Sequence, residues 1–322
     1  VNFTVDEFSH RLYILTTDNM LSCFGYFALL PANTCKLKYQ VPLSVDSTTT
    51  PVSIKYVQEL ESLILIFTNG SILRYSNPNE EDDEGETQEM TNIPKGIIAA
   101  SWSPNEEHLL VVQGDNKLSV FNTRFYVESS VNLDDNDETF APGQEVTEEL
   151  LAIKTAEITW KGDSRIFSIN YSINGGFKCL TRDIEMNIIK GPARSDKENV
   201  TDKNVFSVSE KPSQDLRQPI AMMPSGSLIA GFNITHEEEK EPKHEIVFWE
   251  KNGLRHGQIQ LPKFKSTNSS GEITYHLPYV RKLKFNSDTT FLAALIDFKG
   301  DRSADNSIPK RQIIFLHRSN YQ

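Results

Sequence analysis

The chain has 322 residues with 38% hydrophobic content, which is enough for one large repeat domain or two ordinary domains with a substantial core. A formal net charge of −11 and a pI near 5.2 argue against nucleic-acid binding by this segment alone, because phosphate contacts need clustered Lys and Arg. No apolar run approaches the roughly 20 residues that a membrane helix requires.

One pattern recurs along the chain: a short strand, a polar turn, an apolar strand, a second turn and a third strand. The first two copies are the less regular ones. Copy one comprises Phe3 to Val5, Leu12 to Leu15 and Leu21 to Phe24. Copy two comprises Val52 to Tyr56, Leu63 to Phe67, the Asn69-Gly70 turn and Ile72 to Tyr75.

The third copy is the clearest. It runs from Ile97 to Trp102, through Ser103-Pro104-Asn105 to Leu109–Val112, then through the Gly114-Asp115-Asn116 turn to Leu118–Phe121. Phe125 to Val131 could add a fourth strand. The fourth copy has the same order, with Glu157 to Trp160, the Lys161-Gly162-Asp163 turn, Ile166 to Ile169, the Asn174-Gly175-Gly176 turn and a strand from Phe177.

The last two copies carry longer insertions. Copy five comprises Pro219 to Met222, the Pro224-Ser225-Gly226 turn, Ser227 to Gly231, Glu245 to Glu250, the Asn252-Gly253 turn and Leu254 to Gln260. Copy six comprises Arg281 to Phe285, the Asn286-Ser287-Asp288 turn, Phe291 to Ile296 and Gln312 to Leu316.

A three-strand unit that repeats about every 45–60 residues predicts an all-β fold, a divergent WD-repeat β-propeller, in which adjacent blades bury faces that one blade cannot cover alone. Asn-Gly and Gly-Asp turns fit such meander sheets because they permit positive φ. We expect one domain over residues 1–322, part of a longer scaffold, with six visible blades of a seven-bladed ring. The competing interpretation is one or two β-sandwiches, which also have short strands and polar turns.

Acidic runs such as Glu80–Glu86, Asp134–Glu138 and Glu237–Glu241 lie between the apolar segments and predict solvated loops. We place insertions near residues 78–92, 132–150, 190–216, 233–244, 262–276 and 299–310. Cys23, Cys35 and Cys179 form neither a close metal pair nor an even disulfide set, which favours a reducing compartment and buried free thiols.

The sequence lacks the motifs of common catalytic sites, with no Gly-x-Ser-x-Gly elbow, no recognisable Ser, His and Asp arrangement and no His-Glu-x-x-His motif. His236 and His244 flank the acidic insertion and could bind a cation with its carboxylates, although solvated loop residues are the commoner case. We therefore expect no catalytic residue, no metal and no cofactor.

Binding residues are harder to separate from structural ones. Trp102, Trp160 and Trp249 could be surface anchors, but large aromatics at blade positions are more often core. Arg255 and His256 follow a tight turn and could project toward a partner carboxylate or phosphate, whereas a packing salt bridge is the more common role. The candidate partner-contact or fold-signature residues are Trp160, Gly162, Asp163, Trp249, Asn252, Gly253, Arg255 and His256.

Three motifs occur in the order in which they stand in the family of the largest, scaffolding subunit of the Elongator complex, the IKAP family. Trp160-Lys161-Gly162-Asp163 resembles the family's Trp-Arg-Gly-Asp blade start, and Pro224 to Ala230 resembles its Pro-x-Gly-x-Leu-Ile-Ala. Phe248 to Gly257 is similar to its Phe-Phe-Glu-Arg-Asn-Gly-Leu-Arg-His-Gly. The likeness extends from about Gly96 to the C-terminus; Lys161, Trp249 and Lys251 replace the family's more frequent Arg, Phe and Arg, and Lys190 to Lys211 and the region after Pro262 are less alike.

The resemblance implies the N-terminal propeller of a non-catalytic scaffold that continues into a second propeller and a dimerising helical solenoid outside this chain. Its implied partners are a second WD-repeat subunit and a catalytic subunit with radical S-adenosylmethionine and acetyltransferase-like domains, which carboxymethylates carbon 5 of the tRNA wobble uridine. Contact with tRNA would be indirect, no membrane is involved, and the expected compartments are the cytoplasm and the nucleus. Two other classes stay open: a vesicle-coat or nuclear-pore scaffold, and a propeller enzyme with a site in its central channel.

Overall fold

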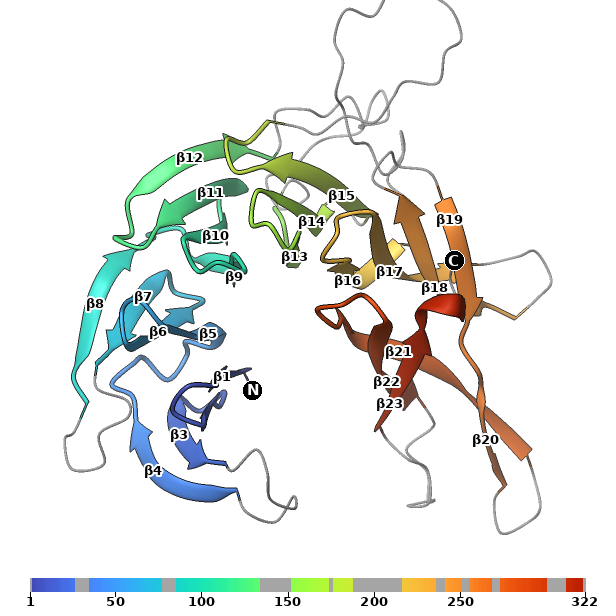
Figure 1. The fold of residues 1–322 in the computed structure, drawn as a ribbon, viewed down its shortest axis with the longest axis horizontal. Coiled ribbons are helices and arrows are strands. Elements are labelled where there is room, and N and C mark those ends of the chain that lie inside the picture. The colour runs from blue at the N-terminus through green and yellow to red at the C-terminus, as the bar shows by residue number, and fades with distance from the viewer. Residues whose placement is uncertain are drawn as a thin grey trace, which may run out of the picture. The chain divides into compact units, whose positions relative to one another are not determined.

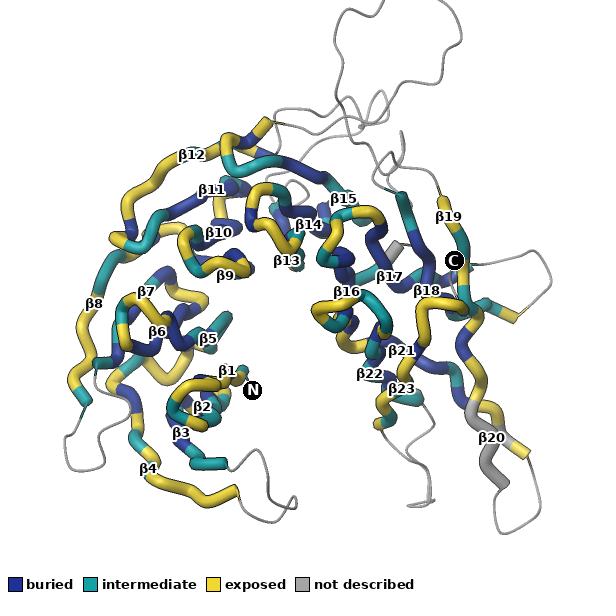
Figure 2. The backbone as a smooth tube through the Cα atoms, viewed as in Figure 1, coloured by how far each residue is buried: buried dark blue, intermediate teal, exposed yellow. Residues whose placement is uncertain are grey.

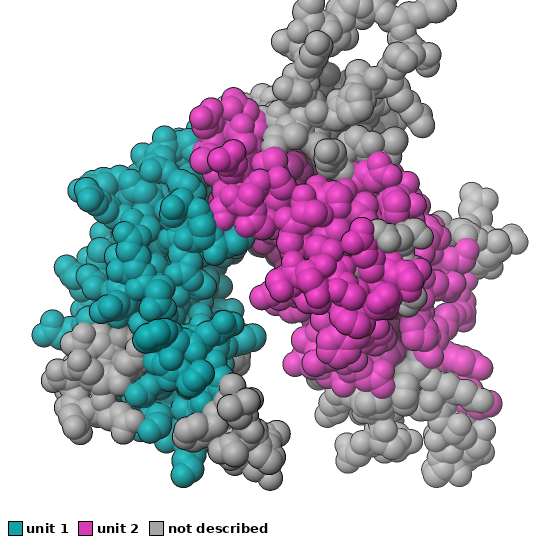
Figure 3. All heavy atoms as spheres, viewed as in Figure 1, with its two compact units in different colours: residues 1–155 teal, residues 156–322 magenta. Residues whose placement is uncertain are grey.

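The computed structural model describes residues 2–26, 35–76, 85–133, 152–173, 176–187, 216–235, 241–250, 255–267, 273–299 and 311–320. Regular structure in these residues is entirely β apart from the 3₁₀ helix η2 (Arg318–Asn320). The chain forms two compact units, Val1–Thr155 and Ala156–Gln322 (Figure 3). Within the described ranges, no helix is both long enough and apolar enough to cross a bilayer.

Unit 1 (Val1–Thr155) contains three antiparallel four-stranded sheets whose strands follow one another in chain order (Figure 1). The strands are β1 (Asn2–Asp6), β2 (Arg11–Leu15), β3 (Met20–Gly25), β4 (Lys36–Pro42), β5 (Pro51–Val57), β6 (Ser62–Phe67), β7 (Ser71–Tyr75), β8 (Thr87–Asn92), β9 (Ile97–Trp102), β10 (His108–Gln113), β11 (Lys117–Asn122) and β12 (Val127–Asn132). The first strands of successive sheets touch, β1 with β5 and β5 with β9, as the inner strands of propeller blades do.

Unit 2 (Ala156–Gln322) also contains three antiparallel sheets among its described residues, one of three strands and two of four. The strands are β13 (Ala156–Trp160), β14 (Ile166–Ile173), β15 (Gly176–Asp183), β16 (Leu216–Met222), β17 (Leu228–Thr235), β18 (Lys243–Glu250), β19 (Arg255–Gln260), β20 (Phe264–Thr267), β21 (Ile273–Phe285), β22 (Phe291–Lys299) and β23 (Arg311–His317). Strand β21 pairs first with β20 and then, from Leu277 onward, with β22. It occupies the inner position of its sheet, because it contacts β16, which in turn contacts β13.

The same first turn occurs in all six sheets of the described chain. The fourth residue after the inner strand has positive φ in every copy: His10, Glu61, Glu106, Ser164, Gly226 and Thr289. In the fourth copy, the Ser164 N–H donates to the Lys161 carbonyl at 3.0 Å, and the Lys161 N–H donates to the Ile166 carbonyl at 2.8 Å. The repeat is therefore preserved in backbone geometry, even though only one of the six turn residues is glycine.

In unit 1 the turn between the second and third strands of each sheet is hydrogen-bonded to the end of the fourth, outer strand. A residue with positive φ in this turn accepts, through its carbonyl, the N–H of the buried residue that follows the fourth strand. The pairs are Asn19–Leu43, Gly70–Ile93 and Asn116–Leu133. Gly70 has a φ of 97°, and a Cβ there would lie 1.9 Å from the Ile93 carbonyl oxygen. This position therefore requires glycine.

The core of unit 1 lies between its sheets rather than inside any one of them. All six residues of β6 are buried, and its two faces belong to different clusters. Leu63, Leu65 and Phe67 pack toward the first sheet, where Tyr13 stacks on Tyr56 at 6.1 Å, whereas Ile64 and Ile66 pack toward the third sheet. Figure 2 shows this contrast, with buried middle strands and largely exposed outer strands β4, β8 and β12. A middle sheet covered on both faces is inconsistent with a two-sheet sandwich.

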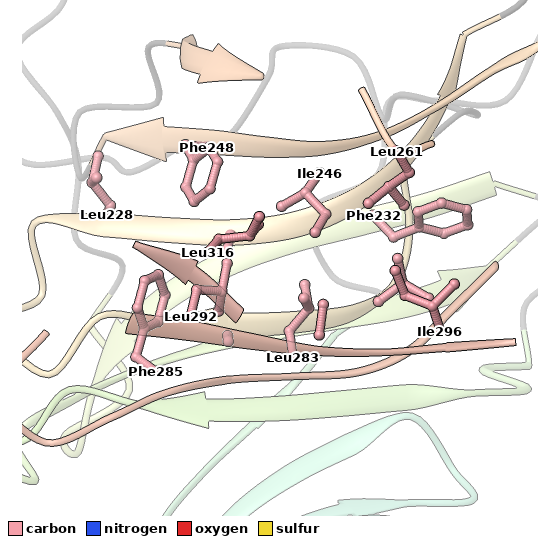
Figure 4. Close-up of a cluster of buried hydrophobic side chains, with 14 of the residues drawn as sticks. Leu228, Phe232, Ile246, Phe248, Leu261, Leu283, Phe285, Leu292, Ile296 and Leu316 are labelled. Atoms are coloured by element: carbon pink, nitrogen blue, oxygen red, sulfur yellow. The ribbon is translucent and has the colours of Figure 1, made fainter. Parts of the chain in front are cut away.

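Unit 2 follows the same plan. Phe232, Ile246 and Phe248 of the sheet β16–β19 pack against Leu283 and Leu292 of the sheet β20–β23 (Figure 4). On the opposite face of β17, Ile229 packs with Ile220 and Met222, against Ile166 and Cys179 of the sheet β13–β15. The middle sheet of unit 2 is therefore also covered on both faces.

The prediction of an all-β fold with six repeated units is confirmed, since each of the six copies corresponds to one sheet. Several insertion boundaries are wrong. The range 78–92 contains β8, 190–216 contains the start of β16, 233–244 contains the end of β17 and the start of β18, and 262–276 contains β20 and the start of β21. Polar outer strands such as Thr87–Asn92 have exposed side chains on both faces and so lack the apolar alternation that marks a strand in sequence.

Other predicted loop segments, 134–150, 188–215 and 300–310, lie outside the described residues, as do the Asn174-Gly175 and Asn252-Gly253 turns. The three thiols are free, but only Cys23 is fully buried. Cys179 is partly buried and Cys35 is exposed, so the expectation of buried thiols is wrong for Cys35. Burial raises the pKa of the Cys23 thiol, although the neighbouring Arg11 opposes that shift.

Candidate functional site

The candidate residues fall into two groups in unit 2. Trp160, Gly162 and Asp163 lie at the end of β13 and in the turn that follows it. Trp249 lies in β18, and Arg255 and His256 begin β19. Asn252 and Gly253 lie outside the described residues, so their predicted turn stays a prediction.

Trp160 belongs to the packed interior. Its side chain is 8% exposed, and its ring centroid lies 5.2 Å from that of Phe167, its partner in the β13–β14 ladder. The indole N–H is buried without a hydrogen-bond partner. Trp102 takes the corresponding position at the end of β9, where it meets Phe125 edge to face at 6.3 Å. These two tryptophans thus have the core role expected of blade aromatics.

Gly162 joins two neighbouring sheets. Its N–H donates a hydrogen bond of 2.9 Å to the carbonyl of Pro224, which lies in the equivalent first turn of the sheet β16–β19. A Cβ on Gly162 would lie 3.0 Å from that carbonyl oxygen. Gly226 lies in the same turn as Pro224, with a φ of 74°. The turn Pro224-Ser225-Gly226 and the turn Lys161-Gly162-Asp163 therefore pack directly against each other.

Asp163 organises its own turn. Its carboxylate accepts a hydrogen bond from the Arg165 N–H at 3.1 Å and another from the Lys161 ammonium at 2.5 Å. Partial burial raises the pKa of Asp163, but these two hydrogen bonds outweigh that effect and hold the pKa below its usual value. Asp288 has the same place in the last sheet, where it accepts the Thr290 N–H at 2.9 Å. Asp163 is thus a recurrent turn-capping residue.

Trp249 stands between Ile229 and Arg255 in the ladder of strands β17, β18 and β19. Neighbouring strand residues point to opposite faces, so Trp249 lies on the face opposite to the buried Phe248. The Trp249 side chain is partly buried, and its indole N–H, which is buried, has no hydrogen-bond partner. Of the candidate tryptophans it is the more accessible.

Arg255 faces a buried carboxylate. Its Nη2 lies 3.6 Å from Oε2 of Glu245, whose side chain is 3% exposed, and it also donates to the Gln258 side chain. Glu245 is further satisfied by Gln258 Nε2 at 3.1 Å and Thr235 Oγ1 at 3.2 Å. Sequence reasoning did not find Glu245, because nothing in the sequence distinguishes this glutamate from those of the adjacent acidic insertion.

His256 is paired more superficially. Its Nδ1 lies 3.1 Å from Oε1 of Glu250 across the β18–β19 pair, and both side chains are partly exposed. A local bulge between Phe248 and Trp249 shifts the register at this point. The side chains of His256 and Arg255 both keep access to solvent, at 31% and 43% exposure, but only Arg255 has a buried partner.

The contacts described for the two groups hold each within its own part of unit 2, and none of them joins a residue of one group to a residue of the other. Among the residues that the structure describes, no three His, Cys, Asp or Glu side chains come together as metal ligands would. His236 lies outside the described residues, and His244 Nδ1 lies 2.5 Å from the Pro278 carbonyl oxygen. That nitrogen therefore donates to a carbonyl and is not free to coordinate a cation.

Comparison with known proteins gives the same fold. The sequence matches the family described as "ELP1 first N-terminal beta-propeller" over residues 4–148 and 137–322. The β-propeller domain of Myceliophteria thermophila Cps50 (Swd1) superposes with a TM-score of 0.54, covering 91% of this chain and 78% of that one at 12% identity, a likeness of fold alone.

Curated relatives are named Elongator complex protein 1. The protein from Oryctolagus cuniculus is 23% identical over 296 residues, which cover 82% of this chain and 19% of the relative. The protein from Saccharomyces cerevisiae is 24% identical over 257 residues, which cover 65% of this chain and 18% of that relative. The Xenopus laevis protein named "Putative elongator complex protein 1" is 31% identical over 150 residues, which cover 47% of this chain and 10% of that relative. The chain thus spans less than a fifth of the length of these relatives.

Proposed function

The chain belongs to the family of ELP1 first N-terminal β-propellers, and on this premise we propose that it is a non-catalytic docking domain in the scaffold subunit of an Elongator complex. The family match over residues 4–148 and 137–322 is the observation that carries this proposal. The name Elongator complex protein 1, shared by relatives from several organisms, supports it.

The chemistry of the candidate residues favours docking over catalysis. Asp163 caps a turn, Trp160 packs in the interior, and Arg255 is paired with Glu245. A general base or nucleophile would instead have to lie beside a group that it activates. Arg255, His256 and Trp249 keep partial exposure on the sheet β16–β19 and are the candidates best placed to touch a partner.

The proposed partners are the catalytic subunit, with its radical S-adenosylmethionine and acetyltransferase-like domains, and a second WD-repeat subunit. By holding these together, the domain would support carboxymethyl-type modification at carbon 5 of the tRNA wobble uridine. Contact with tRNA would be indirect, which agrees with the net charge of −11. The proposed compartments are the cytoplasm and the nucleus, and dimerisation would use other parts of the protein.

The test is to tag the parent protein in its own cells, isolate it at moderate salt and identify co-purifying chains by mass spectrometry. Recovery of the catalytic subunit and the second WD-repeat subunit is the expected result. A parallel strain lacking residues 1–322 should lose or weaken that recovery. Recovery of vesicle-coat or nuclear-pore proteins instead would replace the proposal with the alternative scaffold class.

A second measurement addresses the pathway. Nucleoside mass spectrometry of bulk tRNA should show less carboxymethyl-type wobble uridine in the deletion strain than in the parent strain. Unchanged modification in cells that have lost these residues would contradict a supporting role for the domain. A strongly salt-dependent complex between the purified domain and tRNA would show direct rather than indirect contact.

A further inference from the structure

One arginine of unit 2 is buried with two of its donor nitrogens unused. Arg182, the penultimate residue of β15, is 3% exposed, and its Nη1 donates to the Met186 carbonyl at 2.5 Å. Its Nε and Nη2 are buried and have no hydrogen-bond partner among the described residues. A guanidinium keeps its positive charge in proteins, so burying it without compensating acceptors costs free energy.

The nearest carboxylate along the chain does not compensate this charge. Asp183 follows Arg182 directly, so strand alternation directs its side chain to the opposite face of the sheet. The Asp183 carboxylate accepts hydrogen bonds from the Asn187 N–H at 2.8 Å and from Asn187 Nδ2 at 3.0 Å. Burial lowers the pKa of Arg182, and Tyr171 and Asp183 oppose that shift without cancelling it. The charge of Arg182 is therefore only partly compensated by its own sheet.

Two other arginines of the described chain show what the edge formed by Nε and Nη2 binds. Arg311 donates from Nε at 2.8 Å and from Nη2 at 3.3 Å to the two carboxylate oxygens of Asp297. Arg74 donates from Nε to Ser62 Oγ at 2.9 Å and from Nη2 to the Leu60 carbonyl at 3.0 Å. This edge of a guanidinium thus takes a pair of oxygens, and a carboxylate or phosphate supplies such a pair within one group.

A second cation lies near Arg182 on the same face. The Arg165 carbonyl accepts the Ile184 N–H at 3.2 Å, which extends the β14–β15 ladder beyond its last strand pair. Alternation along the two strands then places Arg165 and Arg182 on one face as diagonal neighbours, within reach of long side chains. Arg165 is exposed, and the carboxylate of Asp163 is held in the turn by the Arg165 N–H and the Lys161 ammonium. The buried guanidinium therefore has a solvent-accessible cation beside it.

We propose that Arg182 binds a free oxyanion, inorganic phosphate or a small carboxylate, through Nε and Nη2, and that Arg165 attracts this anion from solvent. The ligand class follows from the unused atoms. Both are donors, so the ligand must be an acceptor, and a negatively charged acceptor also offsets the buried cation. Entry needs only local opening at the end of β15, where a turn follows the strand. The residues proposed above to touch a partner take no part, so the proposal does not depend on the Elongator role.

The experiment is hydrogen exchange of the full-length parent protein, followed by mass spectrometry, in chloride, phosphate and acetate buffers of equal pH and ionic strength. In phosphate or acetate, the amides of residues 176–187 should exchange at least about three times more slowly than in chloride. The oxyanion with the larger effect identifies the preferred ligand. Amides of β7, whose Arg74 already has its acceptors, should exchange at the same rate in all three buffers. Equal rates at residues 176–187 in all buffers, or equal slowing in β7, would overturn the proposal.

Variants locate the anion. Arg182→Met removes the guanidinium and should abolish the slowing, whereas Arg182→Lys keeps a charge without the paired donors and should retain only part of it. Arg165→Gln should weaken the response to phosphate, and Arg124→Gln, at an exposed arginine of unit 1, should leave it unchanged.

The chloride measurement shows whether Arg182→Met disturbs the sheet, because residues 176–187 would then exchange faster before any oxyanion is added. In that case Arg182→Lys and Arg165→Gln decide the location. Full slowing in the Arg182 variants would overturn the proposal. Slowing that appears only when other subunits are bound would assign the two nitrogens to a partner's carboxylate and would equally overturn binding of a free anion.

Discussion

The guanidinium of Arg255 lies 3.6 Å from the carboxylate of Glu245, which the sheet β16–β19 holds almost fully buried. A residue that begins an exposed outer strand is thereby tied to the interior of its own sheet. Arg255 could support the fold or contact a partner. These two roles can be separated, because loss of the first would lower the unfolding free energy and loss of the second would remove partner subunits from the isolated complex.

Arg255→Ala is expected to destabilise the protein by about 1–3 kcal/mol, because the buried Glu245 would lose its cation while keeping only neutral donors. His256→Ala removes a more exposed pair and should cost about 0.5 kcal/mol or less. Urea unfolding measures both. If Arg255→Ala left the unfolding free energy unchanged but removed partner subunits from the isolated complex, direct partner contact would be the correct role.

Gly70→Ala should destabilise unit 1 by about 2–4 kcal/mol, because the new Cβ would clash with the Ile93 carbonyl and φ is positive. Gly257→Ala is the matched control, since nothing lies within 4 Å of a Cβ at that strand position. Thermal unfolding of the two variants checks the difference. Equal melting temperatures would mean that the turn can relax without cost.

Trp160→Ala should cost about 3–5 kcal/mol through the lost contact with Phe167 and the cavity that it leaves. Trp160→Phe should cost less, since it keeps an aromatic ring and removes an indole N–H that has no partner. Tyr126→Ala serves as the exposed control. A Trp160→Ala variant with wild-type stability and weakened subunit recovery would reassign Trp160 as a binding anchor.

Asp297 should make stability depend on acidity. Hydrogen bonds from Arg311 and Arg281, at 2.8 and 2.7 Å, lower its pKa despite an opposing effect of burial. Because the folded pKa is the lower one, the stabilisation is present above the ordinary value of 3.8 and is lost as pH falls through the folded pKa.

The measurement for Asp297 is the melting temperature of wild type and Asp297→Asn between pH 7 and pH 3. The wild type should be the more stable protein at pH 7, and the difference should shrink toward pH 3. High salt should also reduce the difference, because both arginines are exposed. A difference that grows on acidification would contradict this assignment.

The sequence was most informative where strands are buried. Runs such as Leu63–Phe67 and Leu109–Val112 are apolar at successive positions and bounded by polar turns, so their existence and order could be predicted. Outer strands could not, since Thr87–Asn92 is exposed on both faces and reads as a polar loop. The strand β20 was missed because its four residues, Phe264–Thr267, include a single apolar side chain and so show no apolar alternation, although the strand pairs with the nearby β21.

The candidate residues show the same limit. The segments Trp160–Asp163 and Trp249–His256 were singled out because they resemble family motifs. The resemblance did not reveal which contacts these residues make. Gly162 is explained only by the close approach of Pro224, which lies in the first turn of a different sheet. The burial of Glu245 beside Arg255 likewise depends on the stacking of sheets, which spacing along the chain does not reveal.

The first turns of the six sheets suggest substitutions that would raise the stability of the protein. His10, Glu61, Glu106, Ser164 and Thr289 adopt a left-handed backbone conformation that costs a residue with a Cβ about 1–2 kcal/mol relative to its preferred geometry. Gly226 shows that glycine fits the same turn. The Glu106 carboxylate accepts the Gln58 N–H and pairs with Lys55 of the neighbouring sheet, contacts that glycine would remove. Glycine substitutions at His10, Glu61 and Thr289 would act on separate loops, and the effects of such distant changes usually add. These three first turns are therefore the places where the fold could be made more stable by substitution.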